Sequence, residues 1–92
     1  MQADSRAITN RLRRIEGQVR GLQRMVEEDA YCVDVLTQVA AVQTALEHVA
    51  VKVLDGHVRG CVAGAVAGDD PAAAEAKLDE LMAAVQRFTK TR

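Results

Sequence analysis

The 92-residue sequence has few of the residues that anchor a small core or interrupt a helix. It contains no tryptophan, one tyrosine, one phenylalanine and one proline, and its apolar residues are mainly alanine, valine and leucine. A chain of this length buries a limited fraction of its surface when it folds alone. We therefore expect a single domain, residues 1–92, that is stabilised by oligomerisation.

Long apolar runs are also missing. Nothing approaches the stretch of about 20 apolar residues that crosses a membrane, and the first residues have no apolar run typical of a signal peptide. We therefore expect a cytoplasmic protein that does not contact membranes. In that compartment its two cysteines are expected to be metal ligands or reactive thiols, not a structural disulfide.

Positive charge is concentrated in the first segment of the chain and negative charge in the segment that follows it. Residues 1–26 carry a net charge of +4, whereas residues 27–80 carry −8. The six arginines of the first segment are Arg6, Arg11, Arg13, Arg14, Arg20 and Arg24. This asymmetry indicates that the first segment meets a polyanion, although a solvated helix face would look similar.

Apolar spacing predicts an all-α protomer of three helices, at about residues 5–28, 31–66 and 71–88. In the first helix, apolar residues recur every three or four positions, at Ile8, Leu12, Ile15, Val19, Leu22 and Val26. The long central helix carries two apolar rows, which require partners on more than one side. Asp4 or Ser5 is expected to cap the first helix and Asp29 the second. In "AGDDP", Gly68 ends a helix, and Asp70 and Pro71 start the next.

His57 and Cys61 lie four residues apart and should share one helix face. Cys32 lies 25 residues before His57, roughly 37 Å along a continuous helix at about 1.5 Å per residue. Two antiparallel copies of the helix would bring Cys32 of one chain level with His57 and Cys61 of the other, with two equal sites per dimer. A break at Asp55 and Gly56 that folds the helix back is the alternative.

Two thiolates and one imidazole form a three-ligand set that suits Cu(I), because structural Zn(II) normally takes four ligands. The spacing alone also allows the interpretation that these residues bind no metal. A His/Cys pair four residues apart also arises by chance, and a free cysteine often packs as a small apolar residue.

Three stretches together resemble the copper-sensitive operon repressor family of bacterial regulators. They are "NRLRRIEGQVRGLQRMVEEDAYCVDVLTQVAAVQTALE", "HVRGC" and "LDELMAAVQRF", which cover nearly the whole chain. The family's Cu(I) ligands match Cys32, His57 and Cys61. Tyr31 matches a tyrosine beside the metal site, and Glu80 matches an acid of the metal-linked hydrogen-bond network.

The resemblance also implies an assembly and a partner. Family members form a dimer of dimers, a flat tetramer whose basic faces bind operator DNA until metal binds, so we expect Arg11, Arg13 and Arg14, with Arg59, to contact DNA. The family's nickel and cobalt sensors add an N-terminal histidine that "MQADSRAIT" lacks. Its persulfide sensors lack the histidine at position 57, and its formaldehyde sensors lack the thiol at position 61. The copper branch therefore fits best.

We accordingly predict a Cu(I)-responsive repressor and not an enzyme, since the sequence has no recognisable catalytic triad, phosphate-binding loop or paired-carboxylate site. Two alternatives remain open. Cys32 and Cys61 could act as a thiol-based redox or persulfide sensor in which His57 tunes thiol acidity. The chain could instead buffer copper without touching DNA, which would leave the arginine cluster without a purpose.

Overall fold

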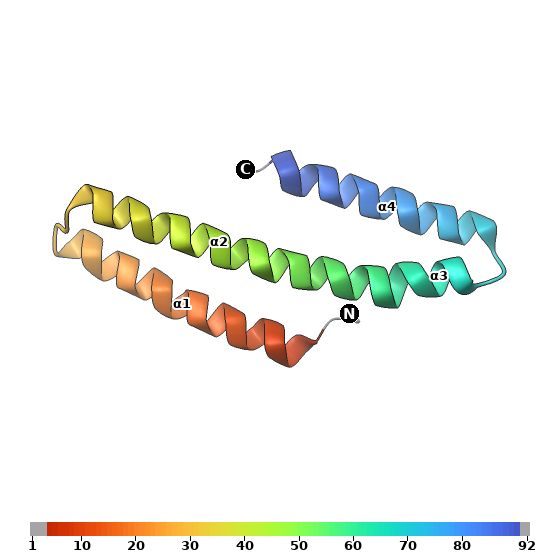
Figure 1. The fold of residues 1–92 in the computed structure, drawn as a ribbon, viewed down its shortest axis with the longest axis horizontal. Helices are drawn as coiled ribbons and strands as arrows, with labels where there is room; N and C mark the ends of the chain where they lie inside the picture. Colours follow the sequence, from red (N-terminus) through yellow and green to blue (C-terminus); the bar gives the residue numbers. More distant parts are fainter. Residues whose placement is uncertain (1–3, 91–92) are drawn as a thin grey trace. The chain divides into compact units, whose positions relative to one another are not determined.

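The computed structural model describes residues 4–90, including all their side chains except those of residues 61–62 and 89–90. The helices are α1 (Ser5–Glu27), α2 (Cys32–Gly56), the π-helix η1 (His57–Val62), α3 (Ala63–Ala67) and α4 (Pro71–Lys90) (Figure 1). The backbone stays helical from α2 through η1 into α3. The prediction of an all-α protomer with three helical runs is confirmed.

Two aspartates start helices as the sequence predicted. Asp4 accepts a hydrogen bond from the backbone N–H of Ala7 at 3.2 Å and caps α1. Asp70 accepts hydrogen bonds from the N–H groups of Ala72 and Ala73, and Pro71 is the first residue of α4. Each carboxylate satisfies N–H groups that a helix leaves unpaired in its first turn.

The expectation that Asp29 caps the second helix is wrong, because Asp29 instead ends the first. Its φ of 56° places it in the left-handed region. Its N–H bonds to the carbonyl of Val26, and the next N–H, that of Ala30, bonds to the carbonyl of Met25. This pair of bonds is the Schellman arrangement, which closes a helix with a left-handed residue. An aspartate occupies the position that glycine usually takes.

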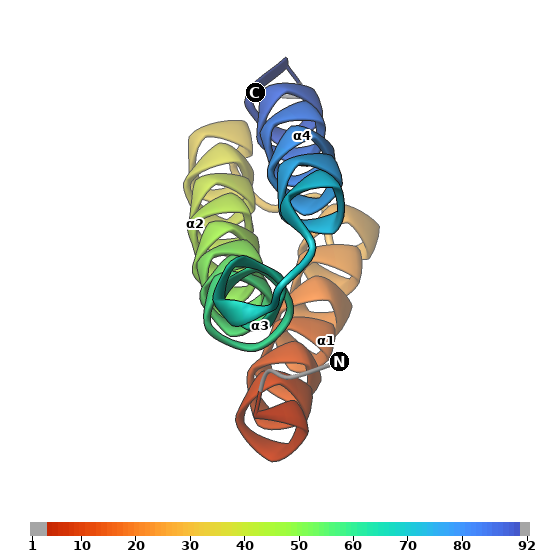
Figure 2. The ribbon, with the colours of Figure 1, turned by 90° about the vertical axis from the view of Figure 1, so that its right-hand side faces the viewer.

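The chain divides into two compact units, the first ending at Leu54 and the second beginning at Asp55. In the first unit α1 and α2 run antiparallel, side by side (Figures 1 and 2). Their core consists of Ile8 and Ile15 from α1 and Val42 and Val49 from α2, with Leu22, Ala45 and Val53 packed against it. Residues seven apart lie on the same side of a helix, so each helix contributes one row to this core.

Half of the predicted apolar stripe of α1 is not covered within the chain. Leu12, Val19 and Val26 are 44%, 41% and 66% exposed, and on α2 Leu36 and Val51 are also exposed. Apolar side chains that recur along one side of a helix form a surface that a partner can cover. We call Leu12, Val19 and Val26 the outer row of α1.

In the second unit, α4 contacts both α3 and η1. The turn between α3 and α4 is visible in Figure 2, where the chain leaves α3 and enters α4. Gly68 opens this turn and donates a backbone hydrogen bond to the carbonyl of Ala65. On α4, Leu78 and Met82 remain exposed. No helix in the described part of the chain combines the length and apolar character needed to cross a membrane.

Candidate metal centre and nucleic-acid interface

Cys32 is the first residue of α2, and its thiol is free and exposed. The preceding residue, Tyr31, accepts backbone hydrogen bonds from Asp34 and Val35 through its carbonyl oxygen, so it starts the helix. The Tyr31 side chain is 67% exposed. The structure therefore places Cys32 at a fixed backbone position with an accessible thiol, beside an exposed phenol.

His57 and Cys61 both lie in η1, the π-helical segment. The N–H of Ala63 bonds to the carbonyl of Val58, five residues back, which gives this turn one residue more than an α-helical turn has. π-Helical turns are rare and are frequent at functional sites. The sequence predicted α-helix here, and no signal that we recognised in "HVRGC" indicates the wider turn.

The His57 side chain is half-buried, whereas the side chain of Cys61 lies outside the described residues. Gly56, just before the turn, has helical dihedral angles, φ −63° and ψ −38°. Among the side chains that the structure describes, no three histidine, cysteine or acidic groups gather within one chain.

Glu80 lies on α4, where its carboxylate is 4.0 Å from the Nζ atom of Lys77. Both side chains are about half exposed. An ion pair of this kind contributes little to stability. Within the described residues Glu80 is thus an exposed acid in contact with a lysine of its own helix.

Arg59 lies in η1 between His57 and Cys61. Its Nε atom donates a hydrogen bond of 2.8 Å to Oδ1 of Asp55, one turn earlier. This hydrogen bond and the charge of Asp55 raise the pKa of Arg59 above its ordinary value. Both side chains are mostly exposed. The role of Asp55 was not predicted from the sequence, although an acid four residues before an arginine on a helix signals such a pair.

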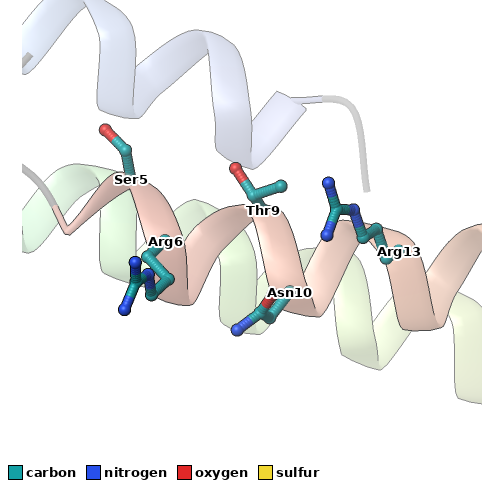
Figure 3. A pocket seen from close by; sticks show the side chains of 5 residues that line it. All are labelled: Ser5, Arg6, Thr9, Asn10 and Arg13. Atoms are coloured by element: carbon teal, nitrogen blue, oxygen red, sulfur yellow. The ribbon is translucent and has the colours of Figure 1, made fainter.

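The three arginines that we expected to contact DNA from α1 do not share one side of the helix. Successive residues turn by about 100°, so Arg13 and Arg14 point about 100° apart, and Arg11 lies about 200° from Arg13. Arg11 is half-buried, while Arg13 and Arg14 are exposed. Arg13 instead shares its side with Ser5, Arg6, Thr9 and Asn10, which line a shallow hollow of about 480 Å³ (Figure 3).

Comparison with known proteins identifies the family. Residues 4–87 match the model of the metal-sensitive transcriptional repressor family. The chain is 51% identical over 84 residues to the copper-sensing transcriptional repressor CsoR of Bacillus subtilis (strain 168), a match that covers 91% of this chain and 80% of that protein. It is 54% identical over 81 residues to the copper-sensing transcriptional repressor RicR of Mycobacterium tuberculosis (strain ATCC 25618 / H37Rv), with 88% of this chain and 83% of that protein covered.

Two solved structures have the same fold. One is the copper-sensing repressor CsoR with Cu(I) from Geobacillus thermodenitrificans NG80-2, with a TM-score of 0.83 and 44% identity over 91% of this chain and 84% of that one. The other is the nickel-responsive transcriptional regulator InrS, with a TM-score of 0.80 and 43% identity over 96% of both chains. The chain therefore belongs to the metal-sensitive transcriptional repressor family, whose members are regulators and not enzymes.

Proposed function

We propose that this protein is a Cu(I)-responsive transcriptional repressor that binds operator DNA without metal and leaves it when Cu(I) binds. One observation carries the proposal: a family member with copper-sensing relatives at 51% and 54% identity has the donor set that Cu(I) prefers. Because its partner is bacterial DNA, we also propose that it acts in the cytoplasm.

The donor chemistry fits Cu(I). Cys32 offers an exposed thiol and His57 a half-buried imidazole, and Cys61 follows His57 in the same turn of backbone. Two soft sulfur ligands favour Cu(I), whereas a structural zinc site would need a fourth ligand. When bound, the metal would link the start of α2 to η1. Tyr31 and Glu80 are proposed to adjust that site from outside the ligand set.

We propose that each site is shared by two chains, with Cys32 from one and His57 with Cys61 from the other. The helical dihedral angles of Gly56 support this arrangement, since a site within one chain would need the backbone to turn back near this residue. The outer row of α1 and the exposed apolar residues of α2 support an antiparallel dimer, because they leave apolar surface for a second copy. We extend this proposal to a dimer of dimers.

DNA binding is assigned to the basic first segment, with Arg11, Arg13 and Arg14 from α1 and Arg59 from η1. Contacts with phosphates supply most of the affinity of such proteins for DNA. Release then requires a coupling free energy between the metal site and the DNA surface, typically about 1–3 kcal/mol.

The deciding experiment is an anaerobic Cu(I) titration of the complex between the protein and its operator, followed by fluorescence anisotropy. We expect release near one Cu(I) per chain. A parallel Ni(II) titration is included because the structure resembles a nickel-responsive regulator. Release by Ni(II) but not by Cu(I) would show that the protein responds to nickel and not to copper. Release that follows thiol oxidation or persulfidation without metal would favour a thiol sensor, and a protein that binds Cu(I) but no DNA would be a copper buffer.

Mixing two variants tests the shared site. A heterodimer of Cys32→Ala with a His57→Ala/Cys61→Ala double variant places all defects in one of the two sites if ligands come from both chains. It should then keep about half of the copper sites, as the two-fold symmetry requires. A heterodimer with no intact site would show that each chain supplies its own three ligands.

A further inference from the structure

Of the four arginines that we assign to DNA contact, only Arg59 is ion-paired within the described part of the chain. Its Nε atom donates a 2.8 Å hydrogen bond to Oδ1 of Asp55, in the last turn of α2. This hydrogen bond and the charge of Asp55 both raise the pKa of Arg59, as expected for a guanidinium in contact with a carboxylate. The positive charge that DNA would use is therefore already partly neutralised in the free protein.

The ion pair lies on a different side of the helix from the proposed ligand His57. Asp55 precedes His57 by two residues, so the two residues point about 160° apart around the axis, at about 100° per residue. Because Arg59 bonds to Asp55, its guanidinium is held on the Asp55 side. A metal site on the His57 side therefore leaves the ion pair open to a partner.

The exposure of the ion pair decides how it can act. The Arg59 and Asp55 side chains are 80% and 59% exposed to solvent. Exposed ion pairs of this kind are weak, because water competes for both charged groups. A DNA phosphate accepts the same charge-assisted hydrogen bonds from a guanidinium as a carboxylate does. Asp55 and phosphate are thus alternative partners of Arg59, and one can replace the other without breaking a buried contact.

We propose that Asp55 competes with DNA phosphate for Arg59 and so limits the affinity of the metal-free protein for DNA. An arginine that must first leave a carboxylate contributes less to binding than a free one, and the carboxylate left beside the phosphate repels it. Limited affinity serves a repressor, because allosteric coupling changes affinity by only about 5- to 150-fold. A protein that held DNA more tightly would stay bound when the metal binds. This inference rests on the DNA binding proposed above and adds a residue that opposes it.

Asp55→Asn tests the competition, because it removes the charge and keeps the size of the side chain. The probe is a labelled mixed-sequence duplex of about 30 bp, since phosphate contacts are independent of sequence. Without metal, the variant should bind about three- to eightfold more tightly at about 0.1 M salt. Its slope of log affinity against log salt should be steeper by about 0.9 for each Arg59 that contacts the duplex. Asp79→Asn is the matched control, since it removes an equal charge from an exposed aspartate of α4 and should change both quantities much less.

A double-mutant cycle with Arg59→Ala shows whether Asp55 acts through Arg59. In the Asp55→Asn background, Arg59→Ala should remove both the gain in affinity and the added slope. In the wild-type background it should weaken binding less, because part of the Arg59 charge is already neutralised there. Asp55→Ala repeats the cycle without an amide oxygen that could still accept the hydrogen bond from Nε. Circular dichroism and sedimentation should show an unchanged fold and oligomeric state, as expected for an exposed ion pair.

The remaining outcomes distinguish the role of Asp55 from DNA binding as such. Wild-type protein that binds no duplex would refute the DNA-binding function itself. Wild-type protein that binds, together with an Asp55→Asn variant that behaves like Asp79→Asn, would overturn the role of Asp55 only. Tighter binding that persists after Arg59→Ala would show that Asp55 repels DNA directly. Weaker binding by Asp55→Asn would show that Asp55 holds Arg59 in place for DNA, and either of these two results would overturn the competition.

Discussion

Replacing Leu12 by alanine tests whether the outer row of α1 is covered by a second chain. Leu12 is 44% exposed in the single chain, whereas Ile15, on the core side, is 7% exposed. If the chain worked alone, Leu12→Ala would cost much less than Ile15→Ala, which removes a buried side chain worth about 2–5 kcal/mol. If a partner covers the row, Leu12→Ala should also weaken association.

The size of that effect follows from the exposed fraction. Complete burial of a leucine or valine side chain contributes about 1.5–3 kcal/mol. The part of Leu12 still exposed is therefore worth about 0.7–1.3 kcal/mol per chain when a partner covers it. A two-fold dimer contains two such contacts, so the variant should lose about 1–3 kcal/mol of association free energy, or roughly ten- to hundredfold in the dimer Kd.

Sedimentation equilibrium over a range of protein concentrations measures this Kd, and denaturation at two concentrations shows whether stability depends on association. Gln18→Ala is the control, since Gln18 is exposed on α1 but lies about 100° from Val19. Ile15→Ala should lower stability at every concentration. A dimer Kd that Leu12→Ala leaves unchanged would refute the assignment of this row to the interface.

Three further predictions concern single residues. His57→Ala should retain copper binding, because two thiolates can hold Cu(I), but lose most of the coupling to DNA, which titration of the DNA complex measures; a full response would remove His57 from the coupling. Asp70→Ala should lower the free energy of unfolding by about 1 kcal/mol through loss of the cap, and Asp69→Ala, the neighbouring exposed acid, should change it little. Asp29→Gly should raise the free energy of unfolding by about 0.5–1 kcal/mol, because glycine adopts a positive φ without steric cost. A lower Tm would contradict this account of the turn.

The parts of the fold that depend on neighbouring residues could be predicted from the sequence. Asp4 caps α1, and Asp70 with Pro71 starts α4, because capping depends on a few adjacent positions. Asp29 was assigned to the wrong helix because aspartate suits both an N-cap and a left-handed residue. The choice between these two roles depends on the direction in which the chain leaves the first helix, which the neighbouring residues do not specify.

The apolar pattern identified which residues avoid water but not what covers them. Ile15 and Leu12 belong to the same predicted stripe, yet only Ile15 is buried within the chain. The width of an apolar stripe does not say whether one helix or two will pack against it. Which apolar residues the chain itself buries therefore becomes visible only in the folded chain.

The metal site depends even more on assembly. Spacing in the sequence placed His57 and Cys61 in one turn, which is a local property. Cys32 lies far from them along the chain, and in our proposal it comes from a second chain, a contact that no spacing within one sequence can show. The ligand assignment accordingly remains a prediction that the titration and mixing experiments will decide.

The wide turn of η1 changes how the chain beyond it should be counted. A turn that holds one extra residue shifts the phase of everything after it by about 100° relative to continuous α-helical counting from Asp55, so the side of the helix on which Val66 lies must be counted afresh from Ala63. A one-residue deletion can therefore remove the wide turn. Deleting one of the residues between His57 and Cys61 would restore α-helical winding and keep the flanking faces where they are. A chain that folds without one of these residues would keep its flanking surfaces but lose the four-residue spacing of the two proposed ligands, and it would therefore separate folding from the proposed metal response.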